Sequence, residues 1–90
     1  MSQVHYRHMD GGLYRFVAHA MSADTDREVV IYEHLWPFEP GLWVRDRKEF
    51  EARFSPVSTE TVEAAQRGDR EAAQAMVNAA KAARRALKAG

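Results

Sequence analysis

The sequence predicts a mainly β fold with helices added, namely a small SH3-like β-barrel of four or five antiparallel strands followed by an alanine-rich helix or helical pair. Three observations support this fold class. All nine aromatic residues precede Pro56, most alanines follow it, and the first half alternates between short apolar runs and turn residues. Because the tail lacks the large apolar groups that a core needs, we expect residues 1–56 to form the barrel and residues 57–90 a helical extension of the same domain.

The first strand is predicted over residues 4–8, where alternation places Val4, Tyr6 and His8 on one face. Asp10-Gly11-Gly12 follows this strand directly. The triplet is a strong hairpin signal, because glycine accepts the positive φ that tight turns require. We therefore expect the first two strands to form an antiparallel hairpin.

The second and third strands are predicted over residues 13–21 and 28–36, with a polar turn at residues 22–26 between them. Strict alternation gives the second strand one face that carries Tyr14, Phe16, Ala18 and Ala20. Residues 37–41 contain two prolines and end the third strand, because proline cannot donate a hydrogen bond to a sheet. A short fourth strand is predicted over residues 42–45.

A short helical turn is predicted next. Asp46 and Glu49 have the spacing of a capping box, with an acidic residue at the N-cap and a glutamate three positions on. Phe50 and Phe54 lie four residues apart, so both should face one side of this turn. We expect the two rings to plug the sheet.

Helices are predicted after Pro56, with Ser58 or Thr59 as the first N-cap and a break at Gly68-Asp69. From residue 70 onward the spacing of polar side chains predicts a helix with a polar stripe, formed by Glu71, Gln74, Asn78, Lys81, Arg85 and Lys88. The opposite stripe is apolar but thin and consists of Met76, Ala80, Ala83 and Leu87. Three fates of this stripe stay open: packing on the barrel, pairing with a second copy in a homodimer, or fraying.

Composition limits the function classes. The chain has 13 basic and 13 acidic residues, and this balance argues against a dedicated nucleic-acid-binding protein. It has no cysteine, which excludes disulfides and cysteine-based zinc sites and favours a reducing compartment. The N-terminus lacks the apolar stretch of a signal peptide, and no segment is apolar enough to span a membrane. We therefore expect a cytoplasmic protein.

Several motifs together resemble a known family: Tyr6-Arg7-His8, Gly11, Tyr14, Val29-Val30-Ile31-Tyr32, Leu42-Trp43-Val44-Arg45 and Phe50. The family is the bacterial domain of unknown function 1653. Its pattern runs Tyr-Arg-His, a glycine-containing turn, a Val-Val-Tyr strand, and Leu-Trp-Val-Arg followed by a phenylalanine. The resemblance covers about residues 5–54 and leaves the alanine-rich tail outside. It implies a fold similar to SH3-type barrels and supplies no established activity.

The chain departs from the family pattern in both turns and after the fourth strand. The first turn of the family usually has a lysine, where this chain has Met9-Asp10. The second usually reads His-Ser-Glu-Thr, where this chain has residues 22–25, Ser-Ala-Asp-Thr. The family has a proline after Leu-Trp-Val-Arg, where this chain has Asp46. If the missing lysine or histidine carried function in relatives, this chain has lost it.

The four histidines do not predict a metal site, and we expect no cofactor. His5 and His8 should point to opposite faces of the first strand, because their separation is odd. If the second and third strands pair about the turn, His19 lies near Val30 or Ile31, and His34 lies near Arg15. Metal ligands must converge on one ion at about 2 Å, which this arrangement does not allow without a bulge. No Gly-x-Ser-x-Gly, Walker loop or Gly-x-Gly-x-x-Gly motif is present, so we assign no catalytic residue.

The favoured function is a non-catalytic binding module for a peptide, a nucleotide, a nucleic-acid strand or another small anion. Residues that combine aromatic faces with polar tips dominate many binding sites. The candidate ligand-binding residues of this kind are Tyr6, Arg7, His8, Tyr14, Tyr32, Trp43 and Arg45. In a small barrel, however, half of these rings must fill the interior, and Arg7 or Arg45 could pair with Glu33 or Glu49.

Two alternatives stay open. A nucleic-acid-associated accessory protein would use Arg45, Arg47 and Lys48 together with a basic tail that consists of Lys81, Arg84, Arg85 and Lys88. A small enzyme would use His8 with a carboxylate as acid and base.

Overall fold

The computed structural model describes residues 4–89 and the side chains of residues 4–87, so Lys88 of the expected polar stripe lies outside the described side chains. The elements are, in chain order, β1 (His5–His8), β2 (Leu13–Met21), β3 (Glu28–Trp36), β4 (Gly41–Asp46), α1 (Arg47–Arg53), β5 (Phe54–Val57), α2 (Thr59–Gln66) and α3 (Arg70–Ala89). The predicted bounds of the second and third strands are confirmed. The sequence did not locate β5, where Pro56 lies opposite Tyr6 of β1.

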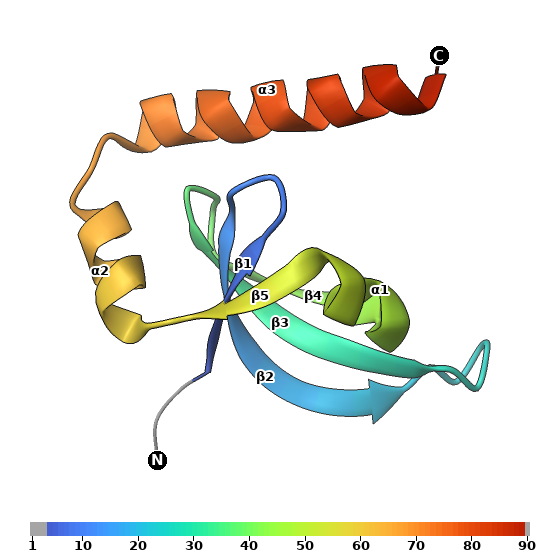
Figure 1. The fold of residues 1–90 in the computed structure, drawn as a ribbon. Coiled ribbons are helices and arrows are strands. Elements are labelled where there is room, and N and C mark those ends of the chain that lie inside the picture. Colours follow the sequence, from blue (N-terminus) through green and yellow to red (C-terminus); the bar gives the residue numbers. More distant parts are fainter. Residues whose placement is uncertain (1–3, 90) are drawn as a thin grey trace.

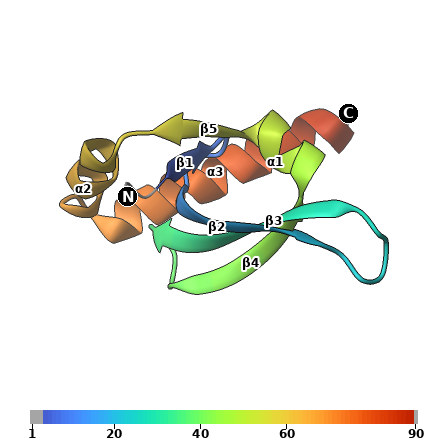
Figure 2. The same ribbon diagram turned by 90° about the horizontal axis from the view of Figure 1, so that it is seen from below.

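The five strands form one antiparallel sheet in the order β4-β3-β2-β1-β5. The sheet curls, but β4 and β5 remain its two edges, so within the described residues it is not closed into a barrel. Helix α1 connects the two edge strands and packs against β3, β4 and β5 (Figures 1 and 2). The SH3-like closed barrel is therefore not confirmed. The fold is a mixed α/β domain in which a helix, and not strand pairing, lies between the edges.

The register between β2 and β3 shifts at two places, between Leu13 and Tyr14 and between Phe16 and Ala18. The second shift determines which residues of β2 share a face. Phe16 pairs with Tyr32 and Ala18 pairs with Ile31, so Val17 is an extra residue in β2. Such a bulge exchanges the two faces of the strand beyond it. The predicted face with Tyr14, Phe16, Ala18 and Ala20 is therefore wrong after residue 17, and the ring centroid of His19 lies 5.0 Å from that of Phe16.

The same pairing places two histidines, one at its predicted position and one not. His19 lies opposite Val30, as predicted. His34 lies opposite Tyr14 and not Arg15, because the bulge shifts the pairing by one residue.

The predicted helix starts are confirmed by their caps. The Asp46 carboxylate accepts a hydrogen bond from the Lys48 amide at the start of α1. Ser58 Oγ accepts from the Thr61 amide at the start of α2. Asp69 Oδ1 accepts from the Ala72 amide and caps α3. These side chains satisfy amides that have no partner inside the helix.

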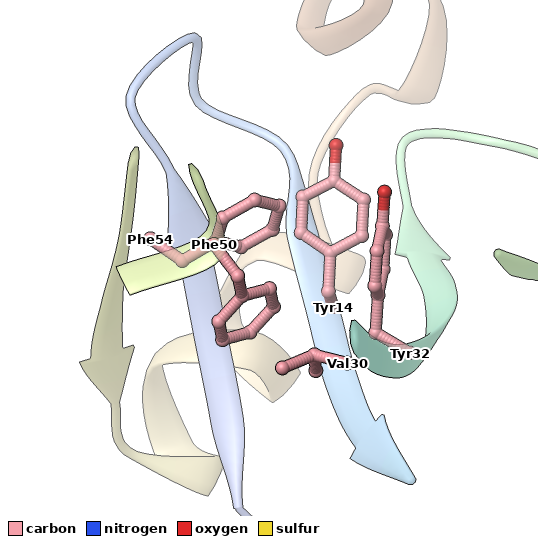
Figure 3. Close-up of a cluster of buried hydrophobic side chains, with 5 residues drawn as sticks. All are labelled: Tyr14, Val30, Tyr32, Phe50 and Phe54. Atoms are coloured by element: carbon pink, nitrogen blue, oxygen red, sulfur yellow. The ribbon is translucent and has the colours of Figure 1, made fainter. Parts of the chain in front are cut away.

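The core fills the inside of the curl with aromatic rings (Figure 3). Its buried members are Tyr14, Val30, Tyr32, Phe50 and Phe54. The rings of Phe50 and Phe54 stack with centroids 4.2 Å apart, which confirms the predicted plug. The helix supplies only Phe50, because Phe54 is the first residue of β5.

Helix α3 lies across one end of the sheet, above the β1–β2 turn and the β3–β4 loop (Figure 1). Val77 is its buried apolar anchor, with 3% of its surface exposed. In contrast, Met76 and Leu87 of the predicted apolar stripe are 74% and 84% exposed. The stripe is therefore not the face that packs on the sheet. Among the described residues, no helix is long and apolar enough to cross a membrane.

Candidate functional site

The concave face of the sheet brings together six of the seven candidate binding residues. Trp43 lies opposite Tyr32 and Arg45 lies opposite Val30, and directly opposed residues of an antiparallel pair share a face. Ring contacts with Phe54 place His8, Tyr14 and Tyr32 on the same face, and Tyr6 packs against Phe50. Arg7 is exposed on the opposite face, because it alternates with Tyr6 and His8.

Tyr14 and Tyr32 belong to the core. They are 6% and 4% exposed, and their ring centroids lie 5.3 Å apart in an edge-to-face arrangement. Their hydroxyl groups point in the same direction in Figure 3. Burial raises the pKa of Tyr14 well above its ordinary value, so this hydroxyl stays neutral. These two tyrosines therefore pack in the core beneath the concave face and are not accessible to a ligand.

His8 is buried next to Asp10 in the β1–β2 turn. Its Nδ1 accepts a hydrogen bond of 3.0 Å from the Asp10 amide, which places the proton of the neutral ring on Nε2. The His8 Nε2 atom is buried and has no hydrogen-bond partner among the described residues. Burial lowers the pKa of His8 to about 4, although the Asp10 carboxylate opposes the shift. His8 is therefore neutral at pH 7.

Arg84 of α3 holds the Asp10 carboxylate. Its Nε and Nη2 atoms donate hydrogen bonds of 3.2 and 2.9 Å to the two carboxylate oxygens. The Asp10 side chain is only 4% exposed, and burial alone would raise its pKa, but the hydrogen bond from Arg84 and the nearby His8 hold it below its ordinary value. This pair fixes α3 to the turn that follows His8.

Arg45 extends over the aromatic core. Its guanidinium carbon lies 5.6 Å from the centroid of the Phe54 ring, a cation–π distance. One guanidinium nitrogen lies 3.6 Å from the carboxylate of Glu49, whereas the buried Nε has no partner among the described residues. The expected pairing with Glu49 is thus present.

Trp43 ends a series of stacked rings at the β4 edge. Its ring lies nearly parallel to that of His34, with centroids 5.0 Å apart, and His34 in turn contacts Phe38. Lys81 of α3 places its ammonium group 5.7 Å from the Phe38 ring centroid. Burial lowers the pKa of His34, and the positive charges of Lys81 and Arg45 act in the same direction. His34 therefore supports Trp43 as a neutral ring.

The accessible part of this arrangement is strand β4 itself. Leu42, Trp43 and Val44 are 65%, 55% and 60% exposed, so three consecutive large apolar side chains meet solvent. Leu42 and Val44 point to the convex face and Trp43 to the concave face. The edge of the sheet thus presents apolar surface on both sides.

Sequence reasoning missed the contribution of α3 and of the turn. Asp10 and Arg84 are separated by 74 positions, and no local pattern links them. No sequence pattern predicted the stacking of His34 on Trp43 or the contact of Lys81 with Phe38. Among the described residues, no group of three or more His, Asp or Glu side chains could hold a metal ion.

The chain was compared with known protein families, curated proteins and solved structures. The family described as "Protein of unknown function (DUF1653)" matches residues 4–67. The chain belongs to this family. No curated protein and no solved structure matches the chain significantly. The family match extends past the expected residue 54 and includes α2, so only α3, with Arg84 and Lys81, lies beyond it.

Proposed function

We propose that this DUF1653 domain is a non-catalytic binding module that takes an extended peptide segment along the edge of β4. The observation that carries the proposal is the run of exposed apolar side chains at Leu42, Trp43 and Val44 on an edge strand. Exposed apolar patches on small proteins mark interaction sites, and tryptophan is enriched among the residues that dominate binding energy.

The two edges of the sheet differ in how they are protected. Strand β5 is short and contains Pro56, a residue that blocks further strand pairing. Strand β4 has six residues and contains neither proline nor lysine. Its outer backbone groups have no partner strand among the described residues. An added strand would satisfy these groups, which is the basis of peptide recognition by sheet augmentation.

The side chains of β4 define the partner. They alternate between the convex and concave faces, so a paired segment would place its own side chains alternately beside Leu42 and Val44 or beside Trp43. We propose a partner segment with apolar side chains at successive positions, an extended conformation and no internal proline. The parallel stack on His34 fixes one face of the Trp43 ring, so little entropy is lost when a partner contacts it.

The test uses short peptides selected on the protein from a displayed pool. The expected result is that a selected peptide slows amide hydrogen exchange in β4 and that Trp43→Ala weakens its binding at least tenfold, about 1.4 kcal/mol. Met21→Ala is the matched control, because Met21 is 62% exposed on the distant β2–β3 hairpin. Exchange protection that spares β4, or equal binding by both variants, would refute the proposal.

The nucleic-acid alternative has weaker support. Arg47 pairs with both Glu28 and Glu51, and Arg45 pairs with Glu49, so these cations face carboxylates and not an open basic surface. Phosphate contacts would make binding fall steeply with added salt, whereas an apolar peptide edge would not. A salt titration of any bound ligand separates the two.

The enzyme alternative rests on His8 and is disfavoured by its surroundings. Its Nδ1 already accepts the Asp10 amide, and its Nε2 carries the proton in the neutral ring. No basic nitrogen of the ring is then free to accept a proton from a substrate.

Self-association through α3 stays a prediction. Met76 and Leu87 of the apolar stripe are exposed, and Ala83 lies between them on the same stripe. A homodimer through this stripe predicts that Ala83→Glu yields a smaller species in light scattering. A monomer mass for the unaltered protein would end this hypothesis.

A further inference from the structure

A hollow with a volume of about 430 Å³ opens on the concave face near the start of β1 and α1. Helix α3 crosses the opposite end of β1 (Figure 1), and none of its residues lines the hollow. The lining residues are Val4, Tyr6, Phe16, His19, Val30, Arg47, Phe50, Glu51 and Phe54. The hollow is distinct from the β4 edge, because it contains none of the exposed residues Leu42, Trp43 and Val44.

The interior of the hollow is apolar. Val30, Phe50 and Phe54 form its floor and are 2%, 4% and 6% exposed. Tyr6 packs edge-on against Phe50 with centroids 4.9 Å apart, and Phe16 forms part of the wall. The inside of the curl thus continues the aromatic core to the surface.

The bulge at Val17 brings one polar ring to this wall. Without the extra residue, alternation would place His19 on the face opposite to Phe16. With it, the two rings lie 5.0 Å apart and line the same hollow. The exposed His19 imidazole therefore stands at the rim of an apolar space.

The charges at the rim are already neutralised. Arg47 and Glu51 are the only charged side chains among the described residues that line the hollow, and they share a hydrogen bond of 2.8 Å. Arg47 also bonds Glu28. An ionic ligand would have to lose its hydration without gaining a free counter-charge. Apart from this ion pair, the Tyr6 hydroxyl and the His19 ring supply the polar side-chain atoms of the lining.

From these features we infer that the hollow binds a small, uncharged aromatic molecule with one hydrogen-bonding group. An aromatic ring fits the floor of Val30, Phe50 and Phe54, and its polar group reaches Tyr6 or His19 at the rim. A dry apolar cavity of about 150 Å³ accepts benzene, and ligand pockets run from about 300 to 1,000 Å³. A hollow of about 430 Å³ therefore has room for a one- or two-ring molecule.

The test is an NMR titration of the full chain with indole, a neutral two-ring probe, and with two charged relatives, indole-3-acetate and tryptamine. The expected result is saturable shifts of the Val30 methyl and His19 ring signals with a dissociation constant on the order of 1 mM, as suits a ligand of so few atoms. The anion and the cation should each bind at least tenfold more weakly. Absence of saturable indole shifts in a folded spectrum, or equal binding of all three probes, overturns the inference.

A pair of variants locates the site. His19→Trp places a large ring at the rim and should reduce indole binding at least tenfold. Met21→Trp is the matched control, because Met21 is an exposed residue of the same strand that does not line the hollow. Equal indole binding by the two variants overturns the inference. Neither result bears on the β4 edge, which is tested separately through Trp43.

Discussion

Acidification should destabilise the protein through His8. This side chain is 5% exposed, and burial lowers the pKa of His8 to about 4 from an ordinary value of 6.5. As the pH falls below 6.5, the His8 ring binds a proton in the unfolded chain but stays neutral in the folded protein. The free energy of unfolding is therefore highest above pH 6.5, where His8 is neutral in both states, and it decreases as the pH falls toward 4.

The magnitude follows from the two pKa values. The interval between 6.5 and about 4 corresponds to roughly 3 kcal/mol once both states are protonated. About 2 kcal/mol of the free energy of unfolding should be lost between about pH 7 and pH 4.5. Burial also lowers the pKa of His34, so the total loss in the unaltered protein is larger than the part due to His8.

Urea unfolding at a series of pH values measures this loss. The variant His8→Gln isolates the His8 part, because its amide oxygen can still accept the Asp10 amide but does not titrate. The difference in pH dependence between the two proteins should be about 2 kcal/mol. An NMR titration in which the His8 ring protonates near pH 6.5, or a variant with unchanged pH dependence, would refute the reasoning.

Two further predictions concern α3 and the first turn. Arg84→Ala should lower the free energy of unfolding in urea by roughly 2–3 kcal/mol and speed amide exchange in α3, because it leaves the Asp10 carboxylate buried without its partner. The control Arg85→Ala removes an exposed neighbouring side chain and should change neither the unfolding free energy nor the exchange. Equal effects of the two variants would contradict the docking of α3 on Asp10. Gly12→Ala should cost about 1–3 kcal/mol, since a Cβ there would lie 2.5 Å from Phe38. The control Gly41→Ala, where a Cβ meets only an ordinary contact at 3.5 Å, should be tolerated, and a thermal melt that ranks the two the other way would disprove the packing.

The strands that were predicted well are those in which the alternation of side chains and the flanking turn residues indicate the same limits. Residues 13–21 and 28–36 alternate strongly and are bounded by polar turns and prolines, so their limits emerge from local chemistry. The extra residue at Val17 has no such signal, because a bulge changes pairing without changing composition. The face of His19 could therefore not be predicted.

The docking face of α3 was missed for a different reason. Hydrophobic periodicity selects the stripe with Met76, but the helix packs through Val77 and through the charged groups of Lys81 and Arg84. Their partner Asp10 and the ring of Phe38 lie far away in the sequence. A rule based on hydrophobicity within one helix cannot detect such contacts.

The candidate binding residues show the same limit. Alternation predicted that Tyr6 and His8 share one face of the first strand, and in the structure both lie on the concave face with four other candidates. Which of them reach solvent depends on the curl of the sheet, since Tyr14 and Tyr32 lie at its centre and Trp43 at its edge.

The ion pair between Asp10 and Arg84 also bears on the order of folding. The hairpins that build the sheet close short loops, whereas this pair closes one of 74 positions, and loop closure costs more entropy as the loop lengthens. During synthesis the turn with Asp10 emerges long before Arg84. The sheet can therefore form before α3 covers the end with the β1–β2 turn. Docking of α3 then completes the fold, because Arg84 pairs with the Asp10 carboxylate.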